Sequence, residues 1–197
     1  MNAYEKLLYS LGGFVLQFAD TERAVLDTLT RLSGVPEEVG KALFSGTRGD
    51  SAISLIYRLL EVRNDSHASK ANQDRFKYAF DQFKAINEAR NLILHHGFKD
   101  KASVTPLSTN ERVALTQERL RSLRVTPELL DGMTSDLAKI EYTLAVNAIT
   151  KGRETPSDWE AILRSLREPW RYTSPAQSTP RASSNQKRKN TPASGEK

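Results

Sequence analysis

The sequence contains no cysteine, which excludes both disulfide bonds and thiolate chemistry. It also has no apolar run near the roughly 20 residues that a helix needs to cross a bilayer. The N-terminus, MNAYEKLLYS, lacks the charged and then apolar order of a signal peptide. These absences predict a protein of a reducing compartment with no membrane partner, and they make the cytoplasm the expected location.

Histidine is scarce, and this limits metal chemistry. The chain has 3 histidines, of which His95 and His96 are adjacent on a predicted helix and diverge. With no thiolate available either, no metal site and no cofactor are expected. The segment 46–50, GTRGD, lacks the GxxxxGK[ST] pattern of a phosphate-binding loop. We interpret it as a turn in which Asp50 caps the following helix.

Positive charge is distributed unevenly along the chain. The formal net charge is +5, and residues 173–197 carry +4 of it, because they contain five Lys or Arg and one Glu. Residues 1–172 therefore carry only +1. The C-terminal stretch is rich in Ser, Thr, Pro, Asn and Gln, so we expect residues 171–197 to form a disordered tail. Any anion site in the remaining domain, residues 1–170, must be local.

Hydrophobic periodicity predicts an all-α fold, an antiparallel helical bundle. Apolar residues recur every three or four positions, with glycine or proline near the ends of the runs. Around 101–117 this period fades, and short alternating runs at 102–107 and 112–117 predict a small β-hairpin or an extended insertion. The predicted helices span about 4–33, 36–44, 50–63, 71–97, 127–152 and 156–167.

The predicted helix 71–97 carries the residues on which the functional interpretation depends. Ile86 lies on its apolar face, and Arg90, four residues later, falls where a core residue would be expected. Asn91 lies at the edge of the same face, and His95 follows Asn91 by one turn. A helix that served only for packing would not place an arginine there.

The stretch Asn87–His96, NEARNLILHH, resembles the signature of the HEPN superfamily of all-α proteins. That signature is an arginine, a polar residue, three further residues and a histidine, late in a long helix; here it is Arg90, Asn91, Leu92–Leu94 and His95. The resemblance implies a metal-independent endoribonuclease that acts as a homodimer, with both motifs in one composite cleft. It also implies attack by the 2′-hydroxyl of the RNA, which leaves a 2′,3′-cyclic phosphate. Other members have lost activity and serve as binding or dimerisation modules.

The residue types suit this chemistry independently of the family. Attack by a 2′-hydroxyl needs a group that takes its proton, a group that protonates the leaving 5′-oxygen, and a fixed cation at the phosphate. Histidine suits proton transfer because its unperturbed pKa is about 6.5. Arg90 stays charged and offers two parallel hydrogen bonds to a phosphate, while Asn91 could orient the phosphate or hold the His95 ring. One chain supplies one cation and one proton-transfer group, so a homodimer is expected.

Each of these residues also has a structural interpretation. Arg90 could belong to a buried ion pair, for which Glu22 is the best candidate as the acid inside the apolar stripe of the first helix. Asn87 could form a hydrogen bond in the core, and His95 could be a favourable cation at a helix C-terminus. His96 points to the opposite flank and would replace His95 only if the helix unwound early.

Three functions are consistent with this sequence. The first is a HEPN-type endoribonuclease that cleaves RNA, in a toxin or defence setting where an antitoxin or regulatory protein could be a partner. The second is a non-catalytic helical dimerisation or interaction module, and the third is a module that binds a phosphate ligand without chemistry. The predicted site has three catalytic and three supporting residues: Arg90, Asn91 and His95, and Glu22, Asn87 and His96.

Overall fold

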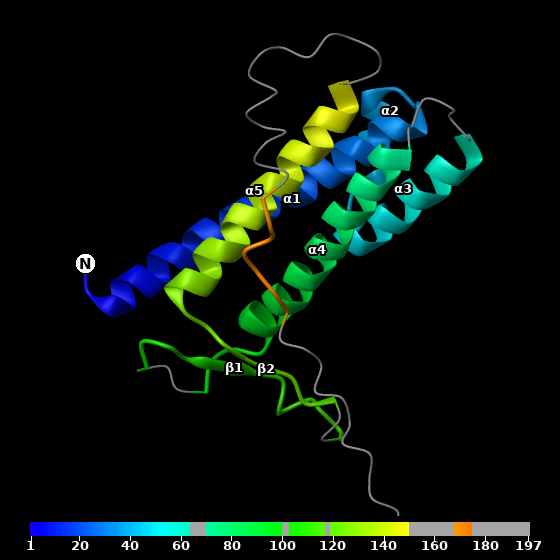
Figure 1. Ribbon diagram of the computed structural model, residues 1–197. Coiled ribbons are helices and arrows are strands. Elements are labelled where there is room, and N and C mark those ends of the chain that lie inside the picture. The colour runs from blue at the N-terminus through cyan, green and yellow to red at the C-terminus, as the bar shows by residue number, and fades with distance from the viewer. Residues whose placement is uncertain (64–69, 100–102, 117–118, 150–167, 175–197) are drawn as a thin grey trace, which may run out of the picture.

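The chain folds into a bundle of helices with a two-stranded hairpin at one end, as the computed structural model shows (Figure 1). This architecture confirms the predicted all-α bundle with a small hairpin. The residues that the structure describes are 1–63, 70–99, 103–116, 119–149 and 168–174. In chain order the elements are α1 (Ala3–Ser33), α2 (Glu37–Phe44), α3 (Gly49–Arg63), α4 (Lys70–His95), β1 (Leu107–Thr109), β2 (Ser122–Arg124) and α5 (Pro127–Ile149).

A capping box and a left-handed glycine define the two ends of α1, the longest helix. The Asn2 side chain accepts a hydrogen bond from Glu5 N at 2.8 Å, and the Glu5 carboxylate accepts one from Asn2 N at 2.8 Å. This capping box satisfies two backbone donors that the first turn leaves free. At the other end Gly34 has a φ of 73°, a left-handed conformation that glycine adopts at little cost. These signals explain why the prediction of a helix over 4–33 is confirmed.

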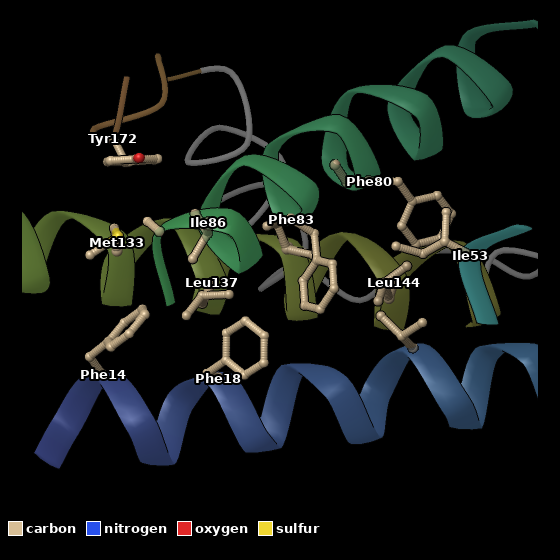
Figure 2. Close-up of a cluster of buried hydrophobic side chains, with 14 of the residues drawn as sticks. Phe14, Phe18, Ile53, Phe80, Phe83, Ile86, Met133, Leu137, Leu144 and Tyr172 are labelled. Carbon is tan, nitrogen blue, oxygen red and sulfur yellow. The ribbon is translucent and has the colours of Figure 1, made fainter. Parts of the chain in front are cut away.

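The core lies between α1, α4 and α5 (Figure 2). Phe14 and Phe18 of α1 point toward α4, and the rings of Phe18 and Phe83 stack with centroids 5.4 Å apart. α4 runs antiparallel to α1 and α5, and side chains of α5 such as Leu137 close the third side. Each large apolar side chain that is fully buried contributes about 1.5–3 kcal/mol. This continuous cluster therefore holds the three long helices together.

α3 covers only part of the face that α1 and α4 form together. Its first residue, Gly49, lies so close to Phe83 that an added Cβ would be 2.9 Å from Cε1 of that ring. Asp50, predicted as a helix cap, lies instead in the first turn and accepts a hydrogen bond from Asn87 Nδ2 at 3.0 Å. From there α3 runs away from the C-terminus of α4 (Figure 1). The last two turns of α4 and the first half of α1 therefore lack this cover.

The hairpin is present, but its second strand is not where the alternating pattern predicted it. The strand predicted at 112–117 is wrong, because Val113 and Leu115 in that segment are exposed and cover no part of the core. Leu123 is buried, so β2 forms where an apolar side chain can face the bundle. The antiparallel register is Leu107↔Arg124, Ser108↔Leu123 and Thr109↔Ser122.

Residues 168–174 pack against the bundle and are fixed by one buried carboxylate. Asp136 Oδ1 accepts a hydrogen bond from Arg171 N at 2.9 Å, and Oδ2 accepts from Tyr172 N at 2.8 Å and from Gln82 Nε2 at 2.9 Å. Tyr172 is buried, and this burial raises the pKa of its phenol. Arg171 and Tyr172, which the prediction assigned to the tail, are therefore attached to the bundle. The predicted helix 156–167 and residues 175–197 of the predicted tail lie outside the described residues.

Trp170 extends the attachment of this segment to both long helices. Its ring stacks on Tyr78 of α4 with centroids 6.2 Å apart, and Lys139 Nζ of α5 lies 4.7 Å from the same ring. Burial lowers the pKa of the Lys139 ammonium, while the nearby carboxylates of Asp136 and Glu168 act in the opposite direction. The segment thus ties α4 to α5 on the side of the bundle away from α1.

Candidate functional site

The motif-bearing end of α4 stays helical through His95. The helix ends there, His96 N donates to Leu92 O at 3.3 Å, and Gly97 follows with a φ of 67°. The early unwinding that would have exchanged the roles of the two histidines does not occur. His95 therefore projects on the same side of the helix as Arg90, and His96 projects elsewhere.

Arg90, Asn91 and His95 come together in one cluster. Nη1 of Arg90 donates to Oδ1 of Asn91 at 3.2 Å and lies 3.3 Å from Nε2 of His95. The guanidinium carbon of Arg90 is 5.1 Å from the centroid of the Phe18 ring, so the cation makes a cation–π contact with α1. Arg90 and Asn91 are partly buried and His95 is exposed. The cluster therefore reaches from the edge of the core to solvent.

The charge of Arg90 has no counter-ion in the described part of the chain. No carboxylate there lies within 4.0 Å of its guanidinium, and its buried Nε has no hydrogen-bond partner among those residues. The expected ion pair with Glu22 is therefore not formed. Instead, Glu22 lies beside the start of α3, where its Cγ is 3.5 Å from the position of a Cβ added to Gly49. A partly buried cation without such a partner favours an anionic ligand.

Arg90 and His95 are in contact through Nη1 and Nε2. A guanidinium has donors only, so a hydrogen bond between these two atoms requires the lone pair of Nε2. The same lone pair is the group that would take a proton from a substrate hydroxyl once Arg90 turned toward its ligand.

The remaining predicted residues lie at the margin of the cluster. Asn87 is bound to Asp50 and fixes the first turn of α3 against α4, one helical turn from Arg90. The His96 side chain is exposed, and in the described part of the chain it makes no hydrogen bond or ion pair. Neither residue contacts the guanidinium. Their supporting roles remain predictions.

Phe18 is the site residue that the sequence analysis did not identify. It occupies an ordinary position in the apolar stripe of α1, and only packing reveals that it also supports the guanidinium. The available signal was its place four residues before Glu22, on the face that was expected to meet Arg90. The expectation that Arg90 faces α1 was sound, but the contacting group is an aromatic ring and not a carboxylate.

Comparison with protein-family models, curated proteins and solved structures found no match to this chain. Within the described residues, no helix has the length and hydropathy that a bilayer span requires. In the same ranges, no three His, Asp or Glu side chains gather where they could hold a metal ion. The local chemistry of the Arg90–Asn91–His95 cluster is therefore the feature that bears on function.

Replacing Arg90 with alanine tests whether this cation serves the fold or a ligand. Breaking a buried ion pair costs about 3–5 kcal/mol, because it leaves an uncompensated charge behind. Arg90 has no such pair among the described residues and loses its contact with Phe18, a part-buried hydrogen bond to Asn91 and an exposed contact with His95, so we expect a loss below about 2 kcal/mol. Urea denaturation measures the difference. A loss of 3 kcal/mol or more, on the scale of a broken buried pair, would assign Arg90 to the fold.

Proposed function

We propose that this protein is a metal-independent endoribonuclease in which Arg90 binds the scissile phosphate and His95 transfers protons. The observation that carries the proposal is a cation that has no carboxylate partner among the described residues and that lies on an aromatic ring beside an exposed imidazole. These groups match the needs of attack by a 2′-hydroxyl on the adjacent phosphorus. The resemblance of this segment to the HEPN signature supports the same reaction.

The reaction can be written from these groups. His95 Nε2 takes the proton of the 2′-hydroxyl, the 2′-oxygen bonds to phosphorus, and the bond from phosphorus to the 5′-oxygen breaks. A second proton-transfer group gives a proton to the departing 5′-oxygen, and a 2′,3′-cyclic phosphate remains. Arg90 stabilises the charge that develops on the phosphoryl oxygens, and Asn91 holds the guanidinium in position. Because one chain offers one imidazole in this cluster, the proposal includes a second copy of the chain.

The first half of α1 offers a surface for that second copy. Gly12 and Gly13 lie inside the continuous helix, where each costs on the order of 1 kcal/mol relative to alanine. A Cβ added to either would meet no described atom within 4 Å, so the glycines serve no close contact within the chain. Leu8 and Leu16 stand four residues on either side of Gly12. In a two-fold antiparallel contact centred there, Leu8 of one copy faces Leu16 of the other.

The exposed apolar area at this surface is close to what a stable dimer needs. Taking about 200 Å² per large side chain, the exposed fractions correspond to about 550 Å² on each copy, or about 1,100 Å² in all. Specific interfaces bury about 1,200–2,000 Å², and a polar rim would supply the remainder. The fractions are 49%, 49%, 77%, 37% and 70% for Tyr4, Leu8, Tyr9, Val15 and Leu16.

This surface also borders the site. The guanidinium of Arg90 lies on the ring of Phe18, five residues after Gly13 on the same helix. A two-fold axis at the glycines would therefore place one Arg90–His95 cluster on each side of it. This continuity supports a second copy, and not an unrelated protein, as the occupant of the surface.

Replacing Leu16 with glutamate tests the dimer. Two carboxylates would be buried near the axis, and we expect the chain to become monomeric and to lose most of its cleavage activity. Sedimentation velocity measures the mass, and Leu43→Glu is the matched control, because Leu43 on α2 is 62% exposed and remote from this surface. A wild-type chain that is already monomeric, or equal masses for wild type and Leu16→Glu, would contradict the proposed interface.

The enzyme proposal is tested by incubating the purified protein with varied RNAs in EDTA. We expect products that end in a 2′,3′-cyclic phosphate, identified by mass spectrometry. If no RNA is cleaved while the chain still dimerises through α1, the exposed apolar surface favours the second candidate, a non-catalytic dimerisation module. The third candidate, a module that binds a phosphate ligand, is favoured if cleavage is absent but RNA binding depends on Arg90.

A further inference from the structure

The hairpin region carries the positive charge of the folded domain. Residues 98–125 contain six Lys or Arg and three Asp or Glu, a net +3. Residues 1–172 carry +1 in total, so residues 1–97 and 126–172 together carry a net charge of −2. The only strongly basic part of the domain is thus the segment that directly follows the motif.

Three arginines of this segment are directed to solvent, and none has an acidic partner in the described part of the chain. Arg112, Arg119 and Arg124 are exposed, and among the described residues no carboxylate lies within 4.0 Å of them. Arg124 makes only a long contact of 3.4 Å to Thr105 Oγ1. Lys99, in contrast, is neutralised by an ion pair with Glu111.

Hydrogen bonds hold the far end of the hairpin in place. Asn110 N donates to Arg121 O at 3.1 Å, and Asn110 Oδ1 accepts from Arg121 N at 2.6 Å. Asn110 Nδ2 also donates to Arg119 O at 3.0 Å. The backbone that carries Arg119 is therefore fixed relative to β1, which lowers the entropy that its side chain loses on binding.

The hairpin is also attached to the end of α4 that carries the site. Ser108 Oγ donates to Leu92 O at 2.6 Å, and Lys99 N donates to Leu107 O at 2.9 Å. Leu92 lies one turn before His95, and Figure 1 shows β1 and β2 across the end of α4. The arginines are thus placed at a defined position relative to the Arg90–His95 cluster.

We propose that the β1–β2 hairpin binds the backbone phosphates of single-stranded RNA next to the scissile phosphate, an inference that rests on the proposed function. The one aromatic residue of 98–125, Phe98, is partly buried against the core, so base stacking has little to contribute and recognition is mainly electrostatic. The same lack of exposed aromatic side chains argues against a membrane surface, since interfacial binding uses Trp or Phe beside the charges. Binding through phosphates positions the RNA without selecting a sequence.

The test measures RNA binding separately from cleavage. The His95→Ala protein is titrated with a fluorescein-labelled oligouridylate of about 20 nucleotides over a range of salt concentrations. Arg112→Gln, Arg119→Gln and Arg124→Gln together remove three phosphate contacts, and each contact contributes about 0.7 to the slope of log K against log salt. We expect the slope to fall by about 2 and the affinity at 0.1 M salt to fall about 10- to 100-fold. The matched control, Arg31→Gln, Lys41→Gln and Lys77→Gln, removes the same charge elsewhere and should leave the slope within about 0.5 of the parent.

The outcomes separate this proposal from the proposed function. Equal slopes for the two triple variants, or no RNA binding by the His95→Ala protein, overturn the hairpin proposal whether or not the wild type cleaves RNA. A lower slope for the hairpin variant supports it, even if the wild type cleaves nothing and the enzyme proposal fails. Loss of binding to phosphatidylserine vesicles without loss of RNA binding would assign the hairpin to a membrane and overturn the proposal.

Discussion

His95→Ala is expected to lower RNA cleavage by about 100-fold or more in a buffer that contains EDTA. General acid–base catalysis by one side chain typically contributes 10²- to 10⁴-fold, and the proposed reaction has no other imidazole in the same cluster. Because His95 is exposed, its removal should leave the thermal unfolding temperature almost unchanged. The measurement is the initial rate on a labelled single-stranded RNA, with unfolding followed on the same preparations.

His96→Ala is the matched control for this experiment. His96 is also exposed, is the next residue in the chain and makes no described contact with Arg90, so its removal should change the rate by less than about twofold. Equal rates for wild type and His95→Ala would refute the catalytic role. A loss confined to His96→Ala would show that the neighbouring histidine is the catalytic one and that the Arg90–His95 contact belongs to the resting protein only.

Asp136→Ala is expected to destabilise the fold by about 3 kcal/mol. The substitution removes the acceptor for the backbone donors of Arg171 and Tyr172 and for the side chain of Gln82. Each buried donor left without a partner costs about 1–3 kcal/mol. Urea denaturation measures the loss, and trypsin should cut after Arg171 faster than in the wild type, because the backbone there is no longer held.

Asp131→Ala provides the comparison, since Asp131 is an exposed carboxylate on the same helix and makes no hydrogen bond within the described residues. Its loss should change the stability by less than about 0.5 kcal/mol. If the two variants were equally stable, the segment 168–174 would owe its position to Trp170 and Tyr172 packing and not to the carboxylate.

The helices could be predicted from the sequence because their signals are local. The acceptors at Asn2 and the left-handed Gly34 act within a few residues of the helix ends that they define. The burial of Tyr172 could not be predicted, because it depends on Asp136, 36 residues earlier in the chain. The second strand was misplaced for the same reason: Leu123 and Leu115 look alike locally, and only contact with the bundle distinguishes them.

The site shows the same division between local and long-range information. The helical spacing predicted that Arg90, Asn91 and His95 lie on one side of α4, and Arg90 Nη1 contacts both of the other side chains. Helical spacing could not predict which residue of α1 contacts Arg90, because Phe18 and Glu22 lie one turn apart on the same face of that helix. The side-chain packing of α1 against α4 decides between them in favour of the ring.

The short reach of α3 has a practical consequence. Its start beside Phe83 leaves the last two turns of α4 and the first half of α1 without its cover. A synthetic amphipathic peptide with leucines four residues apart would compete with the proposed second copy of the chain for the exposed Leu8 and Leu16 of α1. Such an inhibitor would act on assembly, and it would need no group that imitates RNA.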